Sequence, residues 1–255
     1  MAETVVITRP AQQGQALLQR LAAAGRDAVS FPLLEILPLA DESLLLATLG
    51  QLQRYAMVAF VSPNAIACSL RHVPSWPAGV DIAVVGEGSR QALLEHGIDP
   101  KTTRIFSPRN RERSDSETLL EVLDLPALAG RRVLVLRGES GRELLADSLR
   151  RAGAEVELVA AYRRQSPPMD ETRRQQLHAL LAEPRIWVIT SSEALRNLME
   201  MAAQTGDGGD RARLLAQELL LPHIRIEETA RELGFARILR CASGDEALFA
   251  KLQLR

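Results

Sequence analysis

The sequence predicts an α/β protein with two similar lobes, each a parallel sheet flanked by helices, joined by a two-stranded linker. Three observations predict this fold: the apolar runs are short and continuous, helical patterns separate them, and motifs recur in the same order about 128 residues later. Continuous apolarity is typical of strands that are covered on both faces, as in parallel sheets. Alternating strands and helices are typical of right-handed crossovers.

The predicted strands are short runs of apolar residues, many of them β-branched. They lie at residues 5–8, 57–61, 82–85, 133–136, 186–189, 219–221 and 237–239. Apolar residues at helical spacing predict helices between them. These helices are expected at residues 15–24, 89–95, 116–123, 142–152, 193–201, 227–233 and 245–252. Glycine suits the left-handed cap that ends many helices. Such caps are expected at Gly25, Gly97, Gly153 and Gly234.

Two polar segments are expected to be surface loops. Residues 204–210 are rich in glycine and aspartate, which is typical of a flexible loop. The basic run of Arg109, Arg111 and Arg113 is most simply a solvated loop.

An internal repeat supports the two-lobed prediction. Residues 5–9 read like residues 133–137, and each segment is followed by a glycine, a Leu-Leu pair and an Ala-Gly step. Residues 60–66 read like residues 189–195, and 114–119 like 243–248, both 129 residues apart. Because several matches occur in one order at nearly one offset, the chain is predicted to contain two copies of one α/β unit.

Two proline-bounded segments occupy equivalent places in the two copies. They are Ser30–Pro38 and Glu155–Pro167. Proline pushes the residue before it toward an extended conformation, so both segments are expected to be extended. We interpret them as connectors that run between the lobes and pair with each other, with a cleft beside them.

Composition excludes several classes of protein. The 31 Lys and Arg balance 32 Asp and Glu, and the net charge of −1 disfavours a nucleic-acid binder. No apolar run reaches the roughly 18 residues of a membrane helix, and no secretory signal pattern is expected at the N-terminus. Cys68 and Cys241 lack metal-type spacing, and the four histidines are dispersed, which disfavours zinc and haem sites. A reducing cytoplasm is expected.

The candidate binding residues share one position, directly after a predicted strand. Ligands of parallel α/β sheets bind at the carboxyl ends of the strands. Small hydroxyl residues at helix starts suit anion binding, and arginines add clamps for carboxylates or phosphates. An anionic ligand that spans both lobes is therefore expected. The candidates are Arg9, Ser62, Asn64, Gly86, Ser89, Arg137, Thr190, Ser191, Ser192, His223 and Arg225.

Each of these assignments has a structural alternative. Serine at a helix start is equally typical of an N-cap, and Arg9 and Arg137 fit surface ion pairs as well. His223 is a lone histidine of a kind that is more often structural than catalytic. The segment Gly86–Ser89 lacks the third glycine of a dinucleotide fingerprint, because position 91 is glutamine. The usual hydrolytic and metal chemistries find no motif.

Taken together, the motifs resemble the uroporphyrinogen-III synthase family. The resemblance covers nearly the whole chain, and its specificity lies in the order and spacing of short motifs. The matching segments are Val6–Pro10, Pro32–Pro38, Val61–Ala65, Val85-Gly86 before a helix that ends at Gly97, Val135–Gly138, Ala161–Arg163, Thr190–Ser192 and Arg225–Gly234.

The resemblance implies a cofactor-independent lyase. The family cyclises linear hydroxymethylbilane to uroporphyrinogen III, with inversion of ring D and loss of water. In that chemistry the hydroxyl of the hydroxymethyl group on ring A leaves as water, and the substituted carbon of ring D attacks the resulting azafulvene. A spiro intermediate then breaks and recloses inverted. Tyr162 matches a family tyrosine that hydrogen-bonds the leaving hydroxyl, and its connector is expected to expose that phenol at the cleft.

The resemblance also implies the domain organisation and the setting. It implies a discontinuous lobe of residues 1–36 plus 167–255, a second lobe of residues 39–155, and connectors at 30–38 and 156–166. It implies a cytoplasmic monomer without nucleic-acid or membrane partners, which makes transient contact with the preceding enzyme of the pathway.

Two local departures and two alternative functions stay open. Val61 stands where relatives often have threonine, and Ser89 stands where threonine is common. One alternative is a bilobal binding protein for an anionic metabolite, without catalysis. The other is a two-lobed nucleotide-sugar enzyme that uses the Gly86–Ser89 loop.

Overall fold

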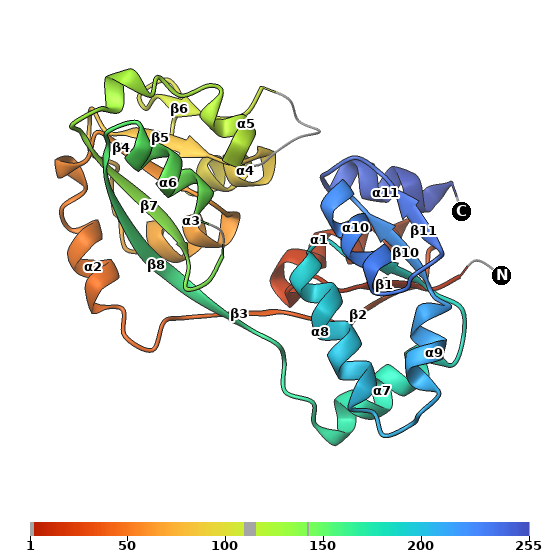
Figure 1. Ribbon diagram of the computed structural model, residues 1–255. Coiled ribbons are helices and arrows are strands. Elements are labelled where there is room, and N and C mark those ends of the chain that lie inside the picture. The colour runs from red at the N-terminus through yellow and green to blue at the C-terminus, as the bar shows by residue number, and fades with distance from the viewer. Residues whose placement is uncertain (1–2, 110–115, 142, 255) are drawn as a thin grey trace. The chain divides into compact units, whose positions relative to one another are not determined.

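The computed structural model describes residues 3–109, 116–141 and 143–254. The chain divides into two compact units (Figure 1). Unit 1 is Met1–Glu35 with Gln165–Arg255, and unit 2 is Ile36–Arg164. Arg111 and Arg113 of the predicted basic loop, and Arg142 of the predicted helix 142–152, lie outside the described residues.

Unit 1 contains a five-stranded sheet with the order β11-β10-β9-β1-β2, and its neighbouring strands are parallel. The strands are β1 (Val5–Ile7), β2 (Ala28–Ser30), β9 (Ile186–Val188), β10 (Glu218–Leu221) and β11 (Ile238–Arg240). The helices are α1 (Ala11–Ala23), α7 (Glu171–Leu181), α8 (Ser192–Ala203), α9 (Asp210–Leu215), α10 (Ile224–Glu232) and α11 (Asp245–Gln253).

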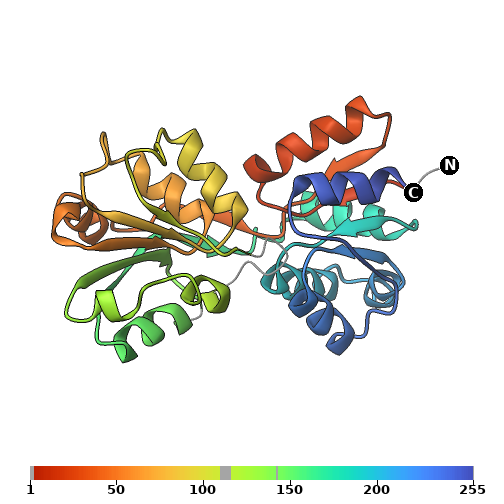
Figure 2. The same ribbon diagram turned by 90° about the horizontal axis from the view of Figure 1, so that it is seen from above.

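The alternating side chains of β1 explain why this sheet is buried on both faces. Val6 packs in one core with residues of α7, α8, α9 and α10. Val5 and Ile7 pack in another core with residues of α1 and α11. Figure 2 shows α1 and α11 on one side of the sheet, with α8 and α10 on the other. Two apolar faces demand continuous apolarity along the strand.

Unit 2 is built around a six-stranded sheet with the order β3-β8-β7-β4-β5-β6. The strands from β8 to β6 are parallel to their neighbours. The strands are β3 (Glu35–Leu37), β4 (Met57–Phe60), β5 (Asp81–Val84), β6 (Ile105–Phe106), β7 (Arg132–Gly138) and β8 (Glu155–Gln165). The helices are α2 (Ser43–Leu49), η1 (Leu52–Arg54), α3 (Pro63–Leu70), α4 (Glu87–Glu95), α5 (Ser116–Leu120), η2 (Pro126–Leu128) and α6 (Leu144–Arg151).

This sheet is also covered on both faces. Val58, Phe60, Leu134 and Leu136 pack with residues of α2, α3 and α4. Met57, Ala59, Val133 and Val135 pack with residues of α5 and α6. The predicted α/β class, with parallel sheets and flanking helices, is confirmed, and β3 lies beside β8 as a two-stranded linker.

The internal repeat is visible in the strand orders. Unit 1 reads β2-β1-β9-β10-β11, and unit 2 reads β8-β7-β4-β5-β6. The first copy in the sequence thus supplies β1 and β2 to unit 1 but β4, β5 and β6 to unit 2. The second copy supplies β7 and β8 to unit 2, and it supplies β9, β10 and β11 to unit 1. Each unit is therefore assembled from part of each copy.

All seven predicted strands are present, whereas several other elements are not anticipated. The strands β2 and β6, and the helices α2, α3, α7 and α9, were not predicted from the sequence. The loop prediction for residues 204–210 is wrong at its end, because Asp210 is fully buried and begins α9. The four expected glycine caps all have positive φ angles, between 72° and 99°. Across the described part of the chain, no helix is long and apolar enough to cross a membrane.

Candidate active site

In unit 2, the candidate site centres on Tyr162, which lies in β8 just after an irregularity in the sheet. β7 and β8 pair in regular register up to Arg137 and Ala160, and the register then shifts so that Gly138 faces Tyr162. The backbone N–H of Glu139 donates to the Tyr162 carbonyl oxygen at 3.0 Å. Such bulges re-aim side chains at the ends of strands.

The Tyr162 ring needs a glycine at position 138. A Cβ atom at Gly138 would lie 3.1 Å from Cζ and 3.3 Å from the hydroxyl oxygen of Tyr162. Because β7 lies between β4 and β8, the missing side chain lets the phenol reach the end of β4. There the Tyr162 hydroxyl lies 3.0 Å from Ser62 Oγ.

Ser62 has a second contact, because it is the N-cap of α3. Its backbone is extended, with φ −164° and ψ 158°, and its Oγ accepts a hydrogen bond from the Ala65 N–H at 3.1 Å. Pro63 follows at the first helical position, where its missing N–H costs no hydrogen bond. The N-cap interpretation of Ser62 is therefore confirmed, and its substrate-binding role stays a prediction.

The structure corrects one expectation for Tyr162. We expected an exposed cleft phenol, but Tyr162 is only 4% exposed. The physical reason is the contact across Gly138, which packs the ring against β7 and leads the hydroxyl to the first turn of α3. The register shift that makes this contact is invisible in the sequence.

The first turns of α3 and α4 adjoin each other beside this group. A Cβ at Gly88 would lie 3.7 Å from Pro63 Cγ. Gly86 is the N-cap of α4 in an extended conformation with φ 178°, and Ser89 is buried in its first turn. Asn64 is half-buried in the first turn of α3. Two helix N-termini, with their backbone N–H groups and positive dipole ends, therefore lie side by side.

Arg137 folds back over the loop that follows its own strand. Its Nε donates to the Gly138 carbonyl at 3.1 Å, its Nη2 to the Gly141 carbonyl at 2.7 Å, and its Nη1 lies 3.3 Å from Glu143 Oε1. Arg164 Nη2 donates to the carbonyl of Ser140 in the same loop at 3.1 Å. Sequence reasoning missed Arg164, although its place directly after the Tyr162-Arg163 motif was a signal. A binding role for Arg137 stays a prediction.

Unit 1 carries the second group of candidates at the carboxyl ends of β9 and β10. Ser191 is the N-cap of α8 and accepts from the Ala194 N–H at 3.4 Å. His223 is the N-cap of α10, and its Nδ1 accepts from the Arg225 N–H at 3.1 Å. Thr190 is half-buried just before this cap of α8.

The starts of α8 and α10 are linked by hydroxyl groups. Ser192 Oγ donates to the Arg225 carbonyl at 3.4 Å and accepts from Thr229 Oγ1 at 3.0 Å. Arg9, after β1, forms an ion pair with Asp245 in the first turn of α11. Unit 1 thus places its predicted residues at helix starts, as unit 2 does. Sequence reasoning missed Thr229 and Asp245, which hold this arrangement.

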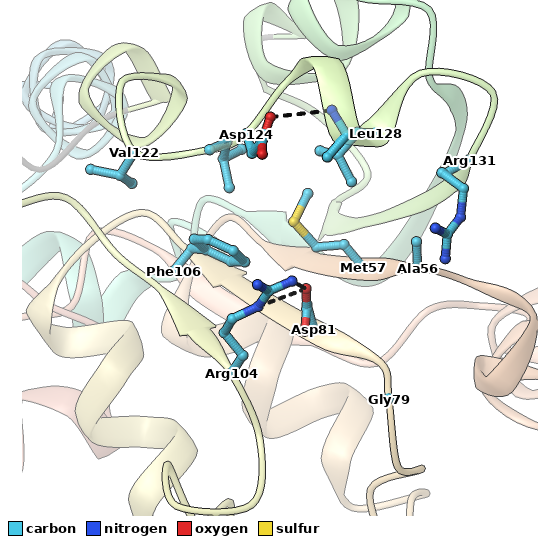
Figure 3. A pocket seen from close by; sticks show the side chains of 12 residues that line it. Ala56, Met57, Gly79, Asp81, Arg104, Phe106, Val122, Asp124, Leu128 and Arg131 are labelled. Carbon is cyan, nitrogen blue, oxygen red and sulfur yellow. Dashed lines mark hydrogen bonds and ion pairs between the residues drawn. The ribbon is translucent and has the colours of Figure 1, made fainter.

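A pocket of about 320 Å³ lies at the opposite end of the unit 2 sheet (Figure 3). Its lining includes Met57 and Asp81 at the amino ends of β4 and β5, and none of the predicted site residues. Asp81 accepts a 3.1 Å hydrogen bond from Arg104 Nε, and the Arg104 guanidinium lies 5.0 Å from the Phe106 ring centre. Asp81 and Arg104 in this lining are therefore paired with each other.

The other tyrosine, Tyr55, has a different environment in the same unit. Burial, together with a hydrogen bond to Glu157, raises the pKa of Tyr55 to about 12. Arg132 pairs with the same Glu157 at 3.1 Å and lies over the Tyr55 ring. These contacts lie near the amino ends of the strands, so Tyr55 supports the sheet, and Tyr162 is the tyrosine at its carboxyl end.

A cluster of His178, Asp207 and Asp210 joins α7 to α9 in unit 1. In the described part of the chain, their possible metal-ligand atoms all lie within 4.8 Å of one another. Arg213 Nη1 already bonds both carboxylates, at 2.6 Å and 2.8 Å. Burial alone would raise the pKa of Asp210, but hydrogen bonds from His178, Arg213 and Thr205 outweigh it and lower that pKa. The Arg213 guanidinium is thus a cation of the protein itself that pairs with both carboxylates.

Comparisons with known proteins agree along the whole chain. A family model described as uroporphyrinogen-III synthase HemD matches residues 15–243. The uroporphyrinogen-III synthase of Salmonella typhimurium is 33% identical over 259 residues, covering 98% of this chain and 100% of that protein. The enzyme of the same name from Escherichia coli is 33% identical over 264 residues, with the same coverage.

Solved structures share the fold. A mutant uroporphyrinogen III synthase from the extremely thermophilic bacterium Thermus thermophilus matches with a TM-score of 0.62 and 17% identity, covering 99% of this chain and 96% of that chain. The uroporphyrinogen-III synthetase of Helicobacter pylori matches with a TM-score of 0.62 and 15% identity over the full length of both chains. From the family model and the full-length relatives, we conclude that the chain belongs to the uroporphyrinogen-III synthase family.

Proposed function

We propose that this protein is a uroporphyrinogen-III synthase, a lyase that cyclises hydroxymethylbilane with inversion of ring D and loss of water. The observation that carries this proposal is the match along the whole chain to relatives of that name, at 33% identity. The sequence also has no motif of the usual hydrolytic or metal chemistries that would point to another reaction.

The helix starts are the proposed binding groups for the substrate. Each pyrrole of the bilane carries an acetate and a propionate, so the substrate is a flexible polyanion. The N-termini of α3 and α4 in unit 2, and of α8 and α10 in unit 1, present backbone N–H groups of the kind that bind carboxylates. Holding the rings in one order would favour inversion by orientation alone.

Tyr162 is the proposed hydrogen-bond donor to the departing hydroxyl. When the C–O bond of ring A breaks, its electron pair leaves with the oxygen, and the phenol proton completes a water molecule. The proton released from a pyrrole carbon at ring closure restores the phenol. The support for this role is the place of Tyr162 at the carboxyl end of the sheet, beside the first turn of α3.

The wider setting is also proposed from the sequence and the family. We expect the two units to act as the two lobes of the enzyme. We expect a monomer, and a reducing cytoplasm is consistent with the free thiols of Cys68 and Cys241. A transient contact with the preceding enzyme of the pathway would shorten the lifetime of free bilane, which also cyclises unaided without inversion.

Product analysis tests the proposal against both alternatives. The purified protein is incubated with enzymatically generated hydroxymethylbilane, and the oxidised products are separated by chromatography. A synthase gives isomer III at a rate proportional to protein concentration. A binding protein for an anionic metabolite, or a nucleotide-sugar enzyme, gives isomer I at the rate of the protein-free control, and that result would overturn the proposal.

A further inference from the structure

We infer that Ser62 is a positioning residue that donates a hydrogen bond to the Tyr162 phenol oxygen and so keeps the phenol proton free for the substrate. This inference rests on the proposed role of Tyr162 in the reaction. It assigns to Ser62 an action through Tyr162, in place of direct contact with a substrate carboxylate.

The hydrogen bonds that Ser62 can form indicate that it donates to Tyr162. A serine hydroxyl has one donor hydrogen and two acceptor lone pairs. The Ala65 N–H occupies one lone pair of Ser62 Oγ, at 3.1 Å. An oxygen that accepts a hydrogen bond becomes a stronger donor through its own hydrogen. The Tyr162 oxygen, 3.0 Å away, is the acceptor that the structure provides for that hydrogen.

The direction of this hydrogen bond decides what the phenol can do. A phenol that donates to Ser62 has spent its only proton, whereas a phenol that accepts from Ser62 keeps the proton for another acceptor. As the phenol gives up its proton, the bond from Ser62 strengthens, because hydrogen bonds to a charged oxygen are stronger than those to a neutral one. Ser62 would thus assist the departure of water through Tyr162.

Packing fixes the position of the Tyr162 ring. Tyr162 is 4% exposed, and its ring fills the space that a Cβ at Gly138 would need. The hydroxyl therefore stays near Ser62, and a small shift of the ring would separate the two oxygens. Burial also makes each hydrogen bond count for more than it would in water.

The internal repeat provides a comparison within the chain. Ser191 lies 129 residues after Ser62 and caps α8 in the same way, by accepting from Ala194 N–H. The positions that correspond to Tyr162 by the offset of 128 to 129 residues are Leu33 and Leu34, which are buried and carry no hydroxyl. The two N-caps are alike, but only the cap at Ser62 has a tyrosine at the corresponding position of its repeat.

Replacing Ser62 by glycine distinguishes its role as an N-cap from its contact with Tyr162. Glycine is nearly as good an N-cap as serine, so Ser62→Gly retains most of the helix start and removes the hydroxyl. We expect kcat for isomer III to fall about tenfold, the effect of one hydrogen bond, with KM changed by less than about twofold. Ser62→Thr restores the hydroxyl and should restore kcat.

A double-variant cycle tests whether Ser62 acts through Tyr162. In the Tyr162→Phe background, Ser62→Gly should change kcat by less than about twofold, because its target is already gone. Ser191→Gly is the matched control, and its effect should multiply with that of Tyr162→Phe. An undiminished effect of Ser62→Gly in the Tyr162→Phe background, or a rise in KM alone, would overturn the inference.

A spectroscopic readout separates this inference from the proposed function. The chain has two tyrosines, so ¹³C labelling at Cζ gives two phenol signals, and Tyr55→Phe assigns them. Ser62→Gly should move the Tyr162 signal and leave the Tyr55 signal in place, and Ser62→Thr should reverse the change. An unmoved Tyr162 signal refutes the contact whatever the activity. A moved signal in a protein that makes only isomer I refutes the proposed function and leaves the contact standing.

Discussion

Tyr162 combines a packed ring with a hydroxyl at the carboxyl end of the sheet. Tyr162→Phe keeps the ring against Gly138 and removes the hydroxyl that lies 3.0 Å from Ser62. If the phenol acts as a general acid, kcat should fall by about 10²-fold. The free energy of unfolding should fall by about 0.5–1.5 kcal/mol, because one hydrogen bond is lost. Steady-state kinetics and urea denaturation measure the two effects, and unchanged kcat would remove Tyr162 from the reaction.

Gly138 is required by proximity to the ring, since its φ angle is not in the left-handed region. Gly138→Ala would place a Cβ 3.1 Å from Tyr162 Cζ, so the ring must move by a few tenths of an ångström. We expect a loss of unfolding free energy of about 1–3 kcal/mol and a lower kcat. Gly208→Ala is the matched control, because a Cβ there meets nothing within 4 Å. Equal stability and activity of the two variants would contradict this packing.

At the residue scale, the sequence predicted positions better than contacts. Ser62, Ser191 and His223 were expected after strands, and each proves to be the N-cap of a helix. The burial of Tyr162 could not be predicted, because it follows from a one-residue register shift between β7 and β8. Such a shift depends on how two distant strands pair, and no local pattern encodes it.

At the scale of elements, burial explains why β7 could be predicted and why β2 and α7 could not. β7 is almost wholly buried, and the continuous apolar run of residues 133–136 within it made it easy to predict. β2 has three residues, none of them fully buried, and lies at the edge of its sheet. In α7 only Leu177 and Leu181 are buried among eleven residues, so the apolar stripe was too thin to predict a helix.

The buried carboxylate of Asp210 joins α7 to α9 and makes stability depend on pH. Its pKa is lowered from the ordinary value of 3.8, because hydrogen bonds from His178, Arg213 and Thr205 outweigh the raising effect of burial. A lowered folded-state pKa means that the ionised form stabilises the fold above pH 3.8, and that this contribution is lost as the pH falls further.

Asp210→Asn should therefore lower the free energy of unfolding at pH 7, by about 1.5–3 kcal/mol for a charged hydrogen-bonding group. The difference from the wild type should shrink as the pH falls below 3.8. Urea denaturation at pH 7 and at pH 3 measures it. Asp207→Asn, at the more exposed carboxylate of the same cluster, should have a smaller effect. An equal deficit at both pH values would refute the electrostatic explanation.

At the scale of the whole molecule, the sequence repeat and the folded units divide the chain differently. Unit 2 is the continuous segment Ile36–Arg164, whereas unit 1 needs both ends of the chain. A cut near residue 128 separates the two sequence copies, but each copy then holds strands of both sheets. A repeat detected from the sequence is thus no guide to where a folding unit begins and ends.

Fragments should reveal this difference directly. Residues 36–164 hold a complete set of hydrogen-bonded strands from β8 to β6, and we expect this fragment to fold alone with cooperative urea unfolding. Residues 1–128 are the matched control, of nearly the same length. We expect that fragment to lack cooperative unfolding by circular dichroism, because it leaves both sheets incomplete. A folded 1–128 fragment would contradict the division into units.

The most direct test of the whole account is the isomer ratio of the product from wild-type protein and from Tyr162→Phe. Each protein is incubated with enzymatically generated hydroxymethylbilane, and isomers III and I are quantified against a protein-free control. We expect chiefly isomer III from both proteins, formed more slowly by the variant, because orientation selects the inverted ring and the phenol assists only the loss of water. Isomer I alone from the wild-type protein would contradict the proposed function. Isomer III from the wild type but chiefly isomer I from a folded Tyr162→Phe variant would show instead that Tyr162 shapes the bilane.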